Sequence, residues 1–296
     1  MTAASHRTGR AVPPRSATLH GRALAVLGAA ASALVAAFVV VPGTLAASGP
    51  GEDFGRESEL ADALRAAFVA YWNSGERAFP PDLDALVDYW FRYHVAKAVI
   101  AALLLSVLVA AGTLLWKAFL RADGPGAGKR FALASAGVLT TLLALLSLAA
   151  VMANVQGAAA PFASLLPLLP TGATGAADGA LGAVLAQVGE RLAVAPGAGE
   201  HAPAALDVMI GDFARYHEAM AAIAATVAVV LAVMSVPAWR RFGRTGPAER
   251  RTRRTLGSFG ALAASAALLV MVVAVANTTT AAAPRPALLA FFEGGW

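Results

Sequence analysis

The chain has no cysteine and few charged residues. Of its 296 residues, 14% are Asp, Glu, Lys or Arg, whereas 58% are hydrophobic and the mean hydropathy is +0.65. The absence of cysteine excludes disulfides, thiolate metal sites and thiol nucleophiles. Several apolar runs are close to or longer than the roughly 20 residues needed to cross a bilayer, which indicates an all-α integral membrane protein with several spans.

Motifs for catalysis are also missing. We find no metalloprotease helix, nucleophile elbow or pair of catalytic carboxylates within a span. The stretch 124–129 only partly resembles a phosphate loop, because its spacing is wrong and Arg130 stands where Ser or Thr is needed. We therefore expect no catalytic residue, metal or cofactor, and we predict that the protein is not an enzyme.

One long stretch of the sequence is repeated. Residues 80–161 align with 203–284 without a gap, at a shift of 123 positions, and about a third of the aligned positions are identical. The identities include Arg92-Tyr93-His94, which recurs as Arg215-Tyr216-His217, and Asn154, which recurs as Asn277. Because many of the shared residues are not Ala or Leu, a tandem duplication explains them better than composition does.

The apolar runs and the duplication together predict five spans. The expected segments are a basic N-terminus (1–22), a first span (23–47), an outer amphipathic loop (48–79), repeat 1 (80–161, spans about 95–116 and 131–155), an outer loop (162–202), repeat 2 (203–284, spans about 219–237 and 256–276) and an outer tail (285–296). The first span is longer than the apolar part of a signal peptide, which favours a retained helix over a cleaved signal.

The distribution of charge predicts the orientation. The N-terminus and the two short turns within the repeats hold 15 of the 23 Lys and Arg residues but only 2 of the 18 acids. This bias predicts a cytoplasmic N-terminus, an extracytoplasmic C-terminus and two repeats of the same orientation, related by a pseudo-two-fold axis along the membrane normal. The net charge of +5 therefore indicates orientation rather than nucleic-acid binding, although the Arg240–Arg254 loop is also suited to anionic lipid.

The outer segments contain apolar residues at helical spacing. Leu60, Leu64 and Phe68 predict a helix that ends near Gly75, and it would pack on the membrane surface, on the other outer loop or on a protein partner. A second short helix is predicted at 181–192. The aromatic tail, with Phe291, Phe292 and Trp296, suits a membrane interface.

The polar residues beside the spans form the candidate functional or interface cluster. Its members are Arg92, Tyr93, His94, Lys97, Asn154, Arg215, Tyr216, His217, Glu218 and Asn277. The Arg-Tyr-His motifs would anchor the helices at the interface, or else place two imidazoles face to face as metal ligands or a proton-sensitive pair. Lys97 would extend to the interface or pair with Glu218. The asparagines would end their spans, or hydrogen-bond across helices to Tyr93 or His217.

Three blocks resemble a known group of proteins. The stretches 88–97, 152–157 and 287–296 are similar to an uncharacterised family of actinobacterial polytopic membrane proteins. Members are often labelled as carrying a twin-arginine signal, but this N-terminus has no paired arginines before its apolar run. The resemblance implies no activity, cofactor or site.

From these observations we predict a non-enzymatic accessory, scaffold or envelope-sensing protein of the cell membrane. Its outer loops would meet a protein partner. The alternative is a small transporter or channel component that uses the interface between the repeats.

Overall fold

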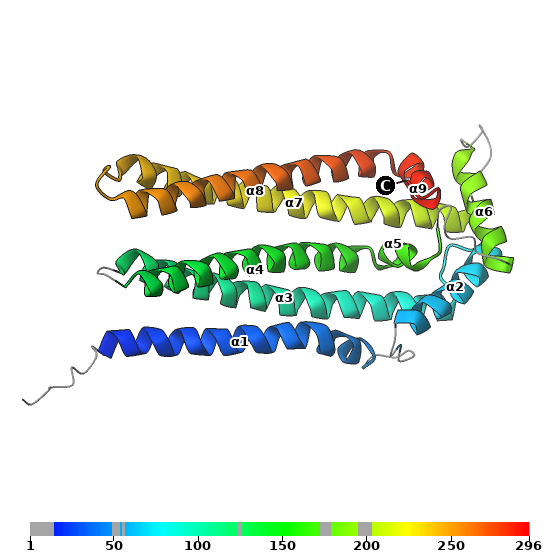
Figure 1. Ribbon diagram of the computed structural model, residues 1–296. Coiled ribbons are helices and arrows are strands. Elements are labelled where there is room, and N and C mark those ends of the chain that lie inside the picture. Colours follow the sequence, from blue (N-terminus) through cyan, green and yellow to red (C-terminus); the bar gives the residue numbers. More distant parts are fainter. Residues whose placement is uncertain are drawn as a thin grey trace, which may run out of the picture.

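The computed structural model describes residues 15–48, 54, 57–122, 126–171, 179–194 and 203–295, apart from the side chains of 15–20 and 57 (Figure 1). All regular structure in these ranges is helical. The helices are α1 (Arg15–Ala46), α2 (Glu57–Ser74), α3 (Pro81–Arg121), α4 (Ala127–Ala159), α5 (Pro161–Leu165), the 3-10 turn η1 (Leu166–Leu168), α6 (Gly179–Ala193), α7 (Ala204–Arg244), α8 (Arg250–Ala282) and α9 (Pro284–Phe292). Most of the basic N-terminus and Trp296 lie outside the described residues.

Five of these helices are long and apolar enough to cross a membrane. They are α1, α3, α4, α7 and α8, whose most apolar windows have mean hydropathies between 2.2 and 2.6. The prediction of an all-α, multi-pass membrane protein with five spans is therefore confirmed.

Four of the long helices form two hairpins. The first hairpin is α3 with α4, and the second is α7 with α8; α3 and α7 each have 41 residues, and α4 and α8 each have 33. Each helix of the second hairpin begins and ends 123 positions after its counterpart, as the predicted duplication requires. Figure 1 shows α3 and α7 running in the same direction, with α1 beside the first hairpin.

Local chemistry explains where several helices begin and end. Pro81 occupies the first turn of α3, and Asp82 and Asp84 complement the positive end of the helix dipole. Gly75 follows α2 with a φ of 67°, a conformation that glycine adopts without a steric penalty. Pro237, the predicted end of the fourth span, lies inside α7, and the helix continues to Arg244.

The short helices form a cap at one end of the bundle. α2, α5, η1, α6 and α9 pack with the first turns of α3 and α7 around one apolar core. The most deeply buried large side chains there are Leu64, Phe68, Tyr71, Leu83, Leu86, Phe162, Leu165, Leu166, Val188, Leu206, Met209 and Leu288. By contrast, the buried cluster between the two hairpins within the spans consists of Met152, Ala224 and Ala274. The densest packing therefore lies outside the predicted lipid-crossing segments.

The cap resolves two sequence predictions. The apolar face of α2 is occupied by its own chain, which selects packing on the other outer segments over a free partner-binding face. Phe291 and Phe292 of α9 are also buried in the cap core, so their predicted role at a membrane interface is wrong.

Burial in the cap core raises the pKa of the Tyr71 phenol to about 12, and the positive charge of Arg77 lowers it by a smaller amount. The hydroxyl therefore stays protonated and donates to the backbone oxygen of Arg77 at 3.4 Å.

We expect Leu64→Ala to destabilise the cap by about 2–5 kcal/mol, the usual cost of removing a buried leucine side chain. Leu64 is 0% exposed, whereas the neighbouring Arg65 is exposed and pairs with Asp62 on its own helix. Arg65→Ala is the matched control and should cost under about 1 kcal/mol. Hydrogen exchange at α2 and α6 measures both effects, and equal effects would contradict the described core.

Candidate functional site

Each hairpin contains one partly buried histidine–asparagine pair. His94 Nδ1 on α3 lies 3.0 Å from Asn154 Oδ1 on α4, and His217 Nδ1 on α7 lies 2.8 Å from Asn277 Oδ1 on α8. Both asparagines sit inside their helices rather than at the ends, so their predicted role as terminators is wrong. The alternative of an interhelical hydrogen bond is confirmed, although Asn154 binds His94 rather than Tyr93.

The second contact of each asparagine fixes the histidine tautomer. The Nδ2 amide of Asn154 donates to Ala150 O at 2.7 Å, and that of Asn277 donates to Val273 O at 2.9 Å. The amide oxygen must then accept from the imidazole, because it has no proton to give. Nδ1 therefore carries the proton in both histidines, and Nε2 is left as an acceptor in the neutral ring.

The two histidines differ in their surroundings. A Cβ on Gly157 would lie 2.7 Å from three atoms of the His94 ring, so the imidazole packs directly on the α4 backbone. Among the described residues, His94 Nε2 and the Trp90 indole N–H are buried polar atoms without a hydrogen-bond partner. The second copy has Thr280 where the first has Gly157, and Phe213 where it has Trp90.

The first Arg-Tyr-His motif and Lys97 connect the first hairpin to α1. Arg92 Nε donates to Ala46 O, the last residue of α1, at 2.9 Å. The Lys97 ammonium lies 4.7 Å from the centre of the Tyr93 ring and 5.0 Å from that of Phe38 on α1. These cation–π contacts place the ammonium beside two aromatic rings, and no described carboxylate forms an ion pair with it.

Residues beside the second motif connect the two hairpins at the cap end. Asp212, one turn before Tyr216, accepts from Ala163 N at 2.8 Å and so binds the N-terminal turn of α5. Arg215 lies 3.6 Å from the same carboxylate. Gln156 Nε2 on α4 donates to Tyr216 O on α7 at 3.2 Å.

The residues of the predicted cluster thus make separate contacts and do not come together in one site. His94 and His217 are bonded within their own hairpins, and their rings make no contact with each other among the described residues. Glu218 is exposed and makes no ion pair with Lys97 in the part of the chain described. Likewise, no three His, Asp or Glu side chains in the described ranges converge as a metal site would require.

Sequence reasoning missed a contact at the other end of the bundle, where the 121–130 and 240–254 turns lie. Arg251 of α8 donates to the C-terminal carbonyls of α3, at 3.3 Å from Phe119 O and 2.8 Å from Ala122 O. Beside it, the rings of Trp116 and Phe259 meet edge to face at 5.0 Å. Arg251 is one of seven arginines in the 240–254 loop, and nothing in the sequence distinguishes it from the other six.

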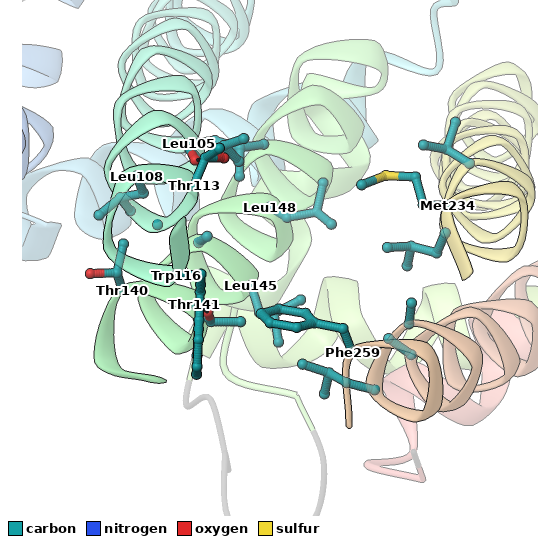
Figure 2. A pocket seen from close by; sticks show the side chains of 18 of the residues that line it. Leu105, Leu108, Thr113, Trp116, Thr140, Thr141, Leu145, Leu148, Met234 and Phe259 are labelled. Carbon is teal, nitrogen blue, oxygen red and sulfur yellow. Dashed lines mark hydrogen bonds between the residues drawn. The ribbon is translucent and has the colours of Figure 1, made fainter. Parts of the chain in front are cut away.

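Between these contacts lies an apolar groove, which we call the interhairpin groove. It has a volume of about 610 Å³ and is lined by residues from 105–120 of α3, 140–148 of α4, 226–234 of α7 and 259–266 of α8. Figure 2 shows Leu145 and Leu148 facing Met234 across it, with Trp116 and Phe259 at one side. An adjoining pocket of about 320 Å³ shares Trp116 and Phe259 with it. Neither the histidines, Lys97 nor Glu218 lines either space.

The comparisons with known proteins give no relative: no family model, curated protein or solved structure matches the chain. The resemblance to actinobacterial membrane proteins therefore stays a prediction.

We expect Gly157→Ala to destabilise the protein by about 1–3 kcal/mol, because the added methyl would press on the His94 ring. Gly28→Ala on α1 is the control, since its Cβ would meet nothing within 4 Å. Thermal unfolding in detergent should show a lower midpoint for Gly157→Ala alone. An unchanged midpoint would mean that the ring does not rest on this glycine.

Proposed function

We propose that the protein is a non-enzymatic scaffold or accessory protein of the cell membrane whose cap meets a protein partner. The observation that supports this most directly is the cap itself. Helices separated by more than 200 residues of sequence, α2 and α9, contribute to one apolar core there, which gives a rigid surface at one end of the spans. A sensing role in the envelope is a third form of the same proposal.

The outer face of the cap is polar and rich in acids. Asp62, Glu76, Asp84 and Glu190 are exposed, while the apolar sides of α2 and α6 are buried. A partner would therefore meet polar and charged groups over a firm core, as in many non-obligate interfaces. The partner's charge would be complementary, since charged interfaces are arranged with opposite potentials.

The transporter alternative has less support. An ion or polar substrate needs polar groups that face a shared cavity within the spans. Here the histidines bond asparagines, Lys97 lies over aromatic rings, and the interhairpin groove is lined mainly by apolar side chains. No observation places these polar groups along a path.

We further propose that the cap is extracytoplasmic and that the turns at 121–130 and 240–254 are cytoplasmic. The excess of Lys and Arg in those turns is the support for this orientation. Reporter fusions after Arg121 and Gly246 should be active in the cytoplasm, and fusions after Ala177 and Trp296 should be active outside. A reversed pattern at any of the four positions would refute the orientation.

The partner proposal predicts a cross-link from the cap surface. A photoreactive amino acid at Asp62, whose side chain is 71% exposed, should give a discrete protein adduct in intact cells. The same residue at Val39, 76% exposed on a predicted lipid-facing side of α1, should give lipid adducts only. If Asp62 and the exposed positions Asp84 and Glu190 all fail to give a protein adduct, the proposed role of the cap is wrong.

A further inference from the structure

We propose that the interhairpin groove binds an anionic phospholipid, with its acyl chains between the hairpins and its headgroup at the basic end of the bundle. This goes beyond the proposed role of the cap, because it concerns the opposite end of the molecule. Four observations lead to it: the position of the groove, the hydrogen bonds of its hydroxyls, the cations at its rim and the side chains of its walls.

The groove has the position that a lipid tail requires. It lies within the spans, since all four lining helices are among the five that could cross a membrane. The hairpins touch beyond it on both sides, through the Met152, Ala224 and Ala274 cluster toward the cap and through the Trp116–Phe259 contact toward the turns. The space between is therefore bounded by fixed contacts, and in a bilayer it fills with apolar chains (Figure 2).

Three of the four threonine hydroxyls that line the groove already have hydrogen-bond partners within the protein. Thr113 Oγ1 donates to Val109 O at 2.7 Å, and Thr226 Oγ1 donates to Ala222 O at 2.8 Å. Thr141 Oγ1 donates to its own helix at Gly137 O and accepts from the Trp116 indole at 3.2 Å. With these groups turned to protein partners, the surface offers little to a polar substrate and suits a hydrocarbon chain.

The cations at the rim are placed to bind the phosphate of the headgroup. Lys117 lines the interhairpin groove and Arg254 lines the adjoining pocket, and both side chains belong to exposed residues at the end where the turns lie. Neither forms an ion pair among the described residues, in contrast to Arg251, which is engaged with the α3 carbonyls. Basic pockets between spanning helices at this level attract phosphate headgroups.

The walls of the groove favour a lipid over another helix. Helix pairs in membranes meet through small residues that let backbones approach, since lipid tails are as apolar as leucine and give no hydrophobic driving force. Thirteen of the 22 residues that line the groove are Leu, Val, Met, Trp or Phe. Three alanines, four threonines and one glycine are the small residues, and the glycine, Gly112, already packs against Thr140. A flexible acyl chain conforms to such walls, and the rim cations then provide the selectivity.

The first experiment tests the headgroup. The full chain is reconstituted in nanodiscs that contain phosphatidylglycerol and phosphatidylcholine with identical acyl chains, and retained lipid is counted by native mass spectrometry. We expect phosphatidylglycerol to be retained selectively, and K117Q/R254Q to weaken that preference roughly 30-fold, from the usual contribution of two basic residues near a membrane surface. R240Q/R244Q is the control, because it removes the same charge from exposed positions that line neither space.

The second experiment tests the acyl chains. Val230→Trp places a large ring at a groove position that is 51% exposed, and Val229→Trp does the same at a neighbouring position that is 56% exposed but does not line the groove. We expect Val230→Trp alone to abolish retention of phosphatidylglycerol. Excess glycerol 3-phosphate, which has the headgroup chemistry without tails, should leave retention unchanged.

Four results would overturn the proposal. They are equal retention of the two lipids, equal loss in the two glutamine pairs, displacement by glycerol 3-phosphate, and retention that survives Val230→Trp. An oligomer that Val230→Trp dissociates and Val229→Trp does not would assign the groove to a second copy of the chain instead.

Discussion

In a bilayer, apolar side chains gain little by leaving acyl chains for one another, so apolarity alone cannot hold two hairpins together. This constraint explains where the chain packs tightly. At the cap, where water provides the driving force, Phe68, Tyr71 and Phe162 are almost completely buried. Within the spans, the described contacts between the hairpins centre on one small cluster. Polar contacts join the hairpins toward the two ends of the bundle, among them Gln156 to Tyr216 O and Arg251 to the end of α3. The interhairpin groove is the space that this arrangement leaves.

Inside each hairpin, the scarce polar groups are used to fix how the helices meet. A buried polar group that loses its partner costs about 1–3 kcal/mol, so a histidine and an asparagine that bond each other across two helices disfavour a shifted register. The aromatic–glycine contacts act in the same way, because Trp116 lies on Gly137 and Trp239 on Gly260 at distances that a Cβ would violate. These pairs occur at equivalent positions of the two hairpins.

Most of the fold was predictable from the sequence, because hydropathy and a 123-residue shift are properties of the chain itself. The five spans, the end of α2 near Gly75 and the short α6 helix follow from apolar runs and turn residues. The contacts of the candidate cluster were less predictable. Whether Asn154 ends a helix or crosses to His94 depends on which residue stands opposite, and Lys97 found Phe38 on α1, which no local pattern indicates. Phe291 likewise suits an interface or a core equally well until the cap is assembled.

The places where the two copies diverged follow from their different neighbours. α1 packs on the first hairpin, and there Arg92 binds the α1 terminus while the Lys97 ammonium lies over Phe38. Among the described residues, no helix packs on the second hairpin in the place that α1 takes on the first. Arg215 is exposed and pairs with Asp212, and the residue at the Lys97 position is Met220, which packs against the small cluster between the hairpins. At position 97 a cation is stabilised because aromatic rings of α1 and α3 lie next to it. At position 220, which faces the other hairpin, a flexible apolar side chain fits instead. The first span, α1, thus gives a physical reason for the difference between two hairpins of equal length.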